Sequence, residues 1–598
     1  MAELATALAP PQATNGIKVP PPSTEELQLL RFLDGLDSEA TEYQKALVEQ
    51  WNMAISLFKG HIWPEGAKAP FFLANVLTPL IDKQTSLFSD AKPIIRVMAR
   101  RAGLKTTETV LQKTLMAGWD EYGLNTVMDE VGYSLNLFSA AFLSNTWDPM
   151  AAFAQGDLCI EAADPRMIRF DPMVTRARDM WRGQYVIQDS IVPLWQVWRM
   201  FPGRGQLVMP NAALKSTLAN AQRTSSTRGG LKAFLQSFSP ASKQAQAAAG
   251  AVPRVHLRHY WFHDPTIKND GTPLYPAGRS VMRDGEGSII LDDRANPYWD
   301  GGWPIVMCDS HYDPDSPWGR VEILAYQRLQ EAINRIGHLF VENTILSGNV
   351  WVTADSDALE PSLLQKLSNL GAIVIRKRFG RTVERNEPPQ MPPHFLDFIR
   401  MAMTMIEELS GLSDTTVSGR GRVELRSGEQ LEGLQAAAQT LIRSLSRRVE
   451  GFLERLGALW VSRLFQFYTG DRMLTFLGPG TEWMTYQFER RQLLEEVLQG
   501  IKDSSEGSIL AAIRKAHQAF LFRVVPGSSL ATVRMARAKT MADLAERGMV
   551  SRVKVLEELG FPNPEEEIER AMKEAQMMQP GPSATGTATA KQGGVPGA

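Results

Sequence analysis

The residues with the clearest chemistry are arginines set among glycines in the segment 411–428. Four side chains there could contact phosphate groups: Ser418, Arg420, Arg422 and Arg426. Glycine lets a backbone approach a strand of phosphates closely, and arginine neutralises phosphate without reading the base sequence. Asp414 and Glu424 leave the segment only slightly positive. The pattern indicates either a nucleic-acid contact or a solvated, flexible surface loop, and the residues alone favour the surface loop.

A second group of basic residues precedes this segment. It comprises Lys366, Arg376, Lys377, Arg378 and Arg381. Asp355, Asp357 and Glu360 lie nearby in the sequence and could form ion pairs with these residues across a subunit boundary. A charged strand edge also discourages aggregation of sheets. The sequence leaves open a solvated edge, an ion-paired subunit contact and a basic binding surface.

Catalytic motifs are absent from the sequence. It has no Gly-x-x-x-x-Gly-Lys-Ser/Thr loop, no His-Glu-x-x-His, no Cys-x-x-Cys and no Gly-x-Ser-x-Gly. His256, His259 and His263 have a spacing that would suit metal ligands on a helix. Alternation over 254–263 instead predicts a strand, on which these histidines fall on mixed faces. We therefore expect no enzyme activity, no metal site and no cofactor.

Long helices must position the two basic groups. Leu329, Ile333, Ile336 and Phe340 repeat at helical spacing. Five segments follow one another: a helix over 319–347, a β-rich insert over 348–391, a helix over 392–410, the loop 411–428 and a helix over 429–469. Glycine at 348 and a run of prolines between 388 and 393 mark the ends of the insert.

Methionines gather around the second of these helices. They are Met391, Met401, Met403 and Met405. Methionine is unbranched and polarizable, so it suits both an irregular core and an adaptable contact surface. The helical spacing favours a core position, and a contact between subunits is the alternative.

The remainder of the chain mixes helices and strands. We expect helices over 25–33, 38–58 and 106–142, and an antiparallel sheet that starts near residue 254 and ends at Trp303–Val306. The uncharged stretch 133–147 is too short and too polar to span a bilayer, so a buried helix is expected there. Residues 203–252, rich in small and polar residues, predict a flexible insert. The fold class is therefore α+β, mostly helical.

Composition sets broad limits. The chain has 598 residues, which favours about three to four domains. Its net charge is −2, so any contact with nucleic acid must be local. Cys159 and Cys308 are the two cysteines, which argues for a reducing compartment and against a disulfide framework. Residues 1–22 lack the pattern of a signal peptide, so we expect assembly in a cytosol.

The order of these elements resembles a tailed-bacteriophage portal protein, the ring at one vertex of a phage capsid. Several short phrases carry the resemblance: Asp164-Pro165, Asp171-Pro172, Ser316-Pro317-Trp318-Gly319, Leu409-Ser410-Gly411-Leu412-Ser413 and Arg426-Ser427-Gly428-Glu429. None is a catalytic motif, and their order and spacing matter more than any one of them. The resemblance covers roughly residues 60 to 570.

The resemblance implies a wing, stem, clip and crown architecture, with long stem and wing helices, a small α/β clip and an antiparallel wing sheet. The implied segments are a disordered tail over 1–24, a wing over 25–318, stem helices over 319–347 and 392–410, a clip over 348–391, a tunnel loop over 411–428, a long wing helix over 429–469, a wing return over 470–525, crown helices over 526–578 and a disordered tail over 579–598. It assigns Ser418, Arg420, Arg422 and Arg426 to the DNA channel. It assigns Lys366, Arg376, Lys377, Arg378 and Arg381 to the clip at the channel exit.

The same resemblance implies the partners. They are other copies of the chain in a ring, usually a dodecamer, non-specifically bound double-stranded DNA, the terminase large subunit, the major capsid or scaffold protein, and a head–tail adaptor, with no membrane. The protein would be assembled in the host cytoplasm and located at a capsid vertex of the virion. Another neck or adaptor ring protein is the main alternative, and a cytosolic enzyme of unrecognised class is a weaker one.

Overall fold

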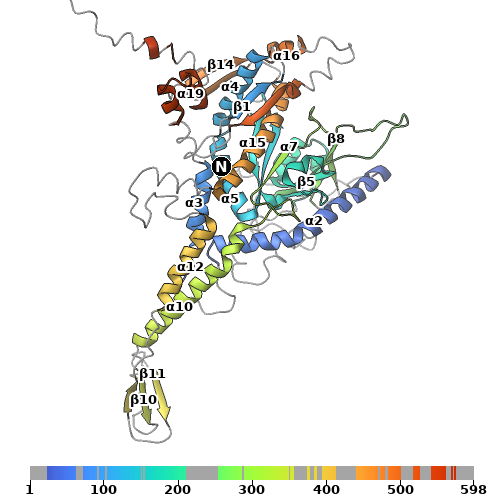
Figure 1. Cartoon of the computed structure of the whole chain (residues 1–598). Helices are drawn as coiled ribbons and strands as arrows, with labels where there is room; N and C mark the ends of the chain where they lie inside the picture. Colours follow the sequence, from blue (N-terminus) through green and yellow to red (C-terminus); the bar gives the residue numbers. More distant parts are fainter. Residues whose placement is uncertain are drawn as a thin grey trace, which may run out of the picture.

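The structure, a computed structural model, has a mixed body from which a helical hairpin projects (Figure 1). It describes residues 23–61, 72–89, 93, 95–100, 104–149, 151, 155–210, 253–285, 289–348, 351–355, 373–377, 383–386, 394–411, 440–468, 472–477, 483–499, 516–525, 540–559, 568–569 and 571–573. Helices and largely antiparallel sheets both contribute to the body, so the α+β class is confirmed. No helix in these ranges is both long and apolar enough to cross a membrane.

The first helix, α2, is continuous over Thr24–Phe58. Two separate helices were expected here, and this expectation was wrong. Gly35 stays within the helix, and a Cβ atom at that position would meet nothing within 4 Å. Ser23 and Glu26 form the reciprocal capping box that fixes the start of the helix. Its N-terminal half packs on a sheet, and its C-terminal half enters the main core.

The helix expected over 106–142 is in fact two helices followed by a strand. α4 spans Lys105–Glu121, α5 spans Leu124–Phe138, and β2 spans Ala140–Asp148. Gly123 and Ser139 both have positive φ, 61° and 60°, and these residues separate the three elements. The uncharged stretch 133–147 is therefore half helix and half strand. Positive φ is uncommon for serine, so the residue type at position 139 does not predict this break.

The main sheet has five antiparallel strands in the order β4-β5-β6-β7-β8. They span Ile168–Phe170, Tyr185–Pro193, Arg254–Phe262, Arg279–Asp284 and Ile290–Ala295. The expected end of this sheet at Trp303–Val306 is wrong. Ile305–Asp309 forms β9, which pairs with β2 in a separate sheet of order β3-β2-β9, where β3 spans Asp157–Ala163.

Short elements connect these sheets, and the first residues of the insert predicted over 203–252 are structured. The connecting elements are η1 (Pro165–Met167), η2 (Ala177–Arg182), α7 (Leu194–Met200) and η3 (Arg204–Leu207). Arg204 in η3 donates a hydrogen bond to the Ile290 carbonyl and pairs with Glu26 of α2. These contacts tie the start of the insert to the sheet and to α2. Residues 211–252 lie outside the described part.

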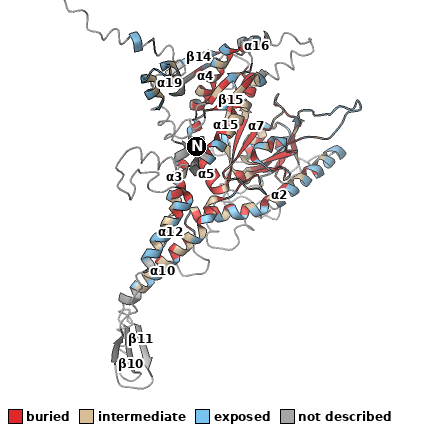
Figure 2. Cartoon of the chain, viewed as in Figure 1, coloured by how far each residue is buried: buried red, intermediate tan, exposed pale blue. Residues whose placement is uncertain are grey.

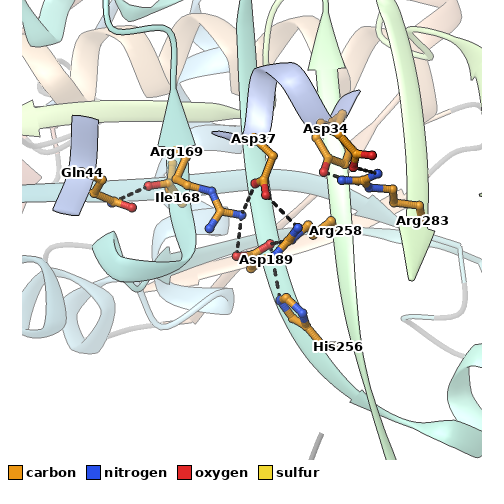
Figure 3. A network of polar contacts seen from close by, with 10 residues as sticks. Asp34, Asp37, Gln44, Ile168, Arg169, Asp189, His256, Arg258 and Arg283 are labelled. Carbon is orange, nitrogen blue, oxygen red and sulfur yellow. Dashed lines mark hydrogen bonds and ion pairs between the residues drawn. The ribbon is translucent and has the colours of Figure 1, made fainter. Parts of the chain in front are cut away.

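Buried ion pairs attach α2 to the main sheet (Figure 3). Asp37 contacts Arg169 at 3.1 Å and Arg258 at 2.8 Å. Asp189 of β5 forms ion pairs with the same two arginines, at 2.7 and 3.3 Å, and lies 3.4 Å from His256. Burial alone would raise the pKa of Asp189, but the charges of Arg169 and Arg258, together with the contact to His256, outweigh it and hold the pKa at about 2. The network fixes the position of α2 across several strands.

An aromatic cluster joins α2, β2, β4 and the segment before the hairpin. The Trp318 ring lies 5.1 Å from Trp51, 5.4 Å from Phe142 and 4.9 Å from Phe170, measured between centroids. Gly319 follows with φ of 75°, and a Cβ there would lie 2.5 Å from the His311 carbonyl oxygen. The Trp-Gly pair at 318–319 is thus required by packing, and the body contains most of the buried residues (Figure 2).

The far end of the body is built from segments distant in sequence. The described part of the long helix expected over 429–469 is α15, over Thr440–Phe467. The other elements at this end are the hairpin of β13 (Arg472–Leu477) and β14 (Trp483–Phe488), α16 (Arg490–Gln499), η7 (Ala516–Ala519) and α19 (Arg552–Leu559), whereas α3 (Leu77–Ser89) packs against α5 nearer the projecting hairpin (Figure 1). β1, over Ile95–Ala99, pairs antiparallel with β15, over Phe520–Val524.

Candidate functional site

The projecting hairpin consists of α10, over Gln327–Gly348, and α12, over His394–Ser410 (Figure 1). The helix expected over 319–347 thus begins later, after the 3-10 turn η5 at Glu322–Tyr326. Ile333 on α10 and Ala402 and Ile406 on α12 are fully buried. Ile333 lies on the apolar stripe that the spacing of residues 329–340 predicts. α12 ends at Gly411, whose φ is 68°.

A small sheet lies at the tip of the hairpin. β10 (Trp351–Asp355) pairs in parallel with β11 (Ile373–Lys377) and antiparallel with β12 (Val383–Asn386). The described residues of the insert, which was expected to be β-rich, therefore form three strands. The edge strand β11 carries two of the basic residues predicted for this insert.

The base of the hairpin is fixed by side-chain amides. Gln330 accepts a hydrogen bond from the Val76 amide at 3.0 Å and donates one to the Ala74 carbonyl at 2.5 Å. Asn334 accepts from the Ala74 amide at 3.0 Å. Both side chains are buried, and they replace the backbone partners that the extended segment before α3 would otherwise need. α10 therefore cannot tilt freely relative to the body.

An apolar stripe runs along the outer side of α12. Phe398 is 36% exposed, Met401 46%, Met405 42% and Leu409 59%. At about 100° per residue these positions share one side of the helix, roughly a right angle away from the side that buries Ala402 and Ile406. α12 thus has two apolar sides, one packed in this subunit and one open to solvent.

Exposed charges border this stripe. Asp397 and Glu408 are exposed beside it, and Arg400, which lies 4.0 Å from Asp397, is exposed farther round the helix. On the facing helix, Leu339 is exposed and Arg328 pairs with Glu331 at 3.2 Å. An apolar centre with a charged rim is the usual composition of a protein–protein contact. Among the residues described here, no group of three or more histidine, cysteine or acidic side chains could hold a metal ion.

The predicted site residues lie mostly outside the described ranges. Those outside are Ser418, Arg420, Arg422, Arg426, Lys366, Arg378 and Arg381. Arg376 and Lys377 lie on β11, in register with Ala354 and Asp355 of β10. Their roles stay predictions.

The methionines and histidines can be placed more fully. Met401 and Met405 lie in the exposed stripe, and Met403 packs partly against the core. The alternative role proposed for the methionines, a contact surface, therefore fits two of them. His256 and His259 lie on the strand β6, where their separation puts them on opposite faces.

The sequence analysis missed Phe398 and Leu409, which complete the stripe. The signal was present, because α12 has more apolar positions than one buried side requires. Positions 398, 401, 405 and 409 form a second set at helical spacing, beside the set that includes 399, 403 and 406. Which set faces the core depends on α10, and the sequence of α12 alone does not specify it.

Comparisons with known proteins find similarity to one protein family in the C-terminal part of the chain. Residues 361–593 match the family model of the phage P22-like portal protein. No curated protein sequence matches the chain. A chain from the virion of the native gene transfer agent (GTA) particle is 9% identical, with 85% of this chain and 93% of that chain covered and a TM-score of 0.34. A chain from the neck of the native GTA particle computed with C12 symmetry is also 9% identical, with 81% and 89% covered and a TM-score of 0.33.

Similarity to solved structures at this level does not specify a function. The family match includes part of the tip sheet, all of α12 and all of α15. The exposed apolar stripe thus lies within the matched region. The match over residues 361–593 confirms the resemblance to tailed-phage portal proteins that the sequence indicated.

Proposed function

We propose that the chain is one subunit of a phage portal ring, a dodecamer as the family resemblance implies, and that it does not act as an enzyme. The observation that carries the proposal is the solvent-facing apolar stripe on α12, within the region that matches the portal family. The stripe exposes four large apolar side chains to water, which is unfavourable in free energy, and the hairpin that carries them is held rigidly at its base. Completing their burial against another copy would gain about 1 kcal/mol per side chain.

The stripe lies on only one side of the hairpin, which favours a ring. A contact between α12 of one copy and a different surface of the next copy is heterologous. Such contacts close into a ring when the rotation between copies allows it. The hairpins would then stand side by side around a central hole, and duplex DNA requires a bore of roughly 20 Å or more.

This proposal assigns a role to each segment. α10 and α12 are the stem, the sheet β10-β11-β12 belongs to the clip, and 411–428 is the tunnel loop. Ser418, Arg420, Arg422 and Arg426 would contact double-stranded DNA without sequence specificity during packaging and ejection. The clip would bind the terminase large subunit and later a head–tail adaptor, while the wing contacts the capsid or scaffold protein.

The ring is tested by placing a charge in the stripe. The Leu409→Glu variant should reduce ring formation by at least about tenfold, because assembly would bury an unpaired carboxylate. Native mass spectrometry gives the number of subunits, and negative-stain imaging shows a central hole. Arg400→Glu is the matched control, since it introduces the same residue on the charged side of the same helix, and it should assemble normally.

Two results would contradict the proposal. A wild-type protein that stays monomeric or dimeric at all concentrations would exclude a self-assembling ring. Equal assembly of the Leu409→Glu and Arg400→Glu proteins would show that α12 is not the contact. A ring that forms only on a preformed ring of another protein would favour the neck-adaptor alternative.

A further inference from the structure

A rigid loop between β4 and β5 presents an exposed tryptophan. Trp181 is 60% exposed and Met173 is 82% exposed, whereas Val174, Ala177 and Met180 of the same loop are buried in the main core. Asp171 closes the loop, accepting from the Met173 and Gln184 amides at 2.8 Å each. The backbone that carries the two large apolar side chains is therefore anchored to the body. A fixed, exposed tryptophan is a typical centre of a binding surface.

This loop is also basic. Arg176, Arg178 and Arg182 are exposed, and Asp179 is the acidic residue among them. Asp179 lies 3.6 Å from Arg178 and 3.7 Å from Arg182, so it offsets part of their charge. The guanidinium carbon of Arg182 lies 4.9 Å from the centroid of the Trp181 ring. We call residues 171–183 the tryptophan loop.

The outer side of α2 has the complementary composition. Seven acidic residues lie in Thr24–Phe58 against two basic ones: Glu25, Glu26, Asp34, Asp37, Glu39, Glu42 and Glu49 against Arg31 and Lys45. Leu27, Phe32 and Met53 are exposed on the same helix. Asp34, Asp37 and Glu26 bind arginines of this subunit, while Glu25, Glu42 and Glu49 face solvent.

The tryptophan loop and the N-terminal half of α2 pack on opposite faces of the main sheet. Leu30 and Leu33 of α2 pack against Tyr185 and Ile187 on one face. Val186, which points to the other face, belongs to the core cluster that contains the buried side of the tryptophan loop. One copy can therefore present α2 to one neighbour and the tryptophan loop to the other, as a ring requires.

We infer that the tryptophan loop of one copy binds the acidic outer side of α2 on the next copy. The inference rests on the proposed ring and specifies a second contact, far from the hairpin in the fold. Charge complementarity favours a second copy over nucleic acid, because Asp179 sits within the arginines and would repel phosphate. Trp181 supplies the apolar centre, and the arginines and the glutamates of α2 supply its charged rim.

The inference is tested by a photo-crosslinking residue in place of Trp181, in the full-length assembled protein. We expect crosslinks to peptides within residues 24–58 of another copy, identified by mass spectrometry. Separately, Trp181→Ala should raise the concentration at half-assembly at least about tenfold, as expected for a hot-spot tryptophan. The matched control is Trp195→Ala, an equally exposed tryptophan on α7, which should change it less than about threefold.

The outcomes separate this inference from the proposed function. If no oligomer forms, the ring and this contact both fail. If a ring forms but position 181 crosslinks to other segments or to none, this contact fails and the ring stands. If Trp181→Ala assembles normally but loses binding to a duplex oligonucleotide, the loop is a nucleic-acid surface and the inference is wrong.

Discussion

The ion pair between Asp34 on α2 and Arg283 on β7 allows a quantitative test of how α2 is held. Arg283 is 1% exposed, its Nη1 lies 2.7 Å from Asp34, and its Nε donates to the Tyr260 hydroxyl at 2.9 Å. Asp34→Ala would leave the guanidinium buried without this carboxylate. Breaking a buried pair usually costs about 3–5 kcal/mol. Because the Asp34 side chain is 64% exposed, water can replace part of the interaction, so we expect about 1–3 kcal/mol.

Removing the other partner should have a different effect. Arg283→Met eliminates the buried charge and keeps most of the volume, so the free energy of unfolding should change by less than about 1 kcal/mol or increase. The double variant should resemble Arg283→Met alone. Glu49→Ala is the control, since it removes an exposed acidic residue from the same helix and should change stability by less than about 0.5 kcal/mol.

Denaturant unfolding measures these free energies, and hydrogen exchange of the α2 amides shows whether the helix detaches. Asp34→Ala should exchange faster over the N-terminal half of α2, with the C-terminal half protected by Trp51 in the core. An Arg283→Met variant that loses more stability than Asp34→Ala would refute the reasoning. It would mean that the arginine contributes through its packing on Tyr260, over which it lies at 5.0 Å.

Two further predictions concern pH and the base of the hairpin. Burial, with the charge of Arg294, lowers the pKa of His259 from 6.5 to about 3, so the unfolded chain binds the proton first as the pH falls below 6.5. The free energy of unfolding should therefore decrease by about 1–2 kcal/mol between about pH 6.5 and pH 5. Thermal melts should show that the His259→Gln variant lacks this pH-dependent loss. If the wild-type protein and the variant lose stability in parallel as the pH falls, the assignment to His259 is wrong. Gln330→Leu should lower the free energy of unfolding by about 1–3 kcal/mol and speed hydrogen exchange at the Val76 amide, because this amide and the Ala74 carbonyl lose their partner. Gln327→Leu, on the same helix, is the control. Unchanged exchange at Val76 in Gln330→Leu would exclude this role for Gln330.

The sequence predicted the elements whose signals are local. The α10 and α12 helices follow from apolar residues at helical spacing, and β6 follows from alternation. The expected start of the first helix in the chain, residue 25, agrees within a residue with the start of α2, where Ser23 and Glu26 form a local capping box. These features depend on neighbours within a few positions, so they can be read without knowing the rest of the fold.

Features set by distant partners could not be predicted in the same way. β9 follows the main sheet in sequence but pairs with β2, because the hydrogen bonds that decide this come from residues 140–144. The position of Ser139 in the left-handed region depends on the packing of α5 and β2 around it. In the candidate site, Met401 and Met405 could be named from composition, but their exposure follows from how α10 covers α12.

The pairing of β1 with β15 also constrains how the chain is made. The partners of residues 95–99 are residues 520–524, so roughly 420 residues separate the two strands. At about 5–20 residues per second, a ribosome needs on the order of 20 to 80 s to synthesise that interval. During this time β1 has an unpaired edge that can pair wrongly with other strands. A premature stop before residue 520 would leave that edge open permanently, so truncated chains should aggregate rather than enter assemblies as defective subunits.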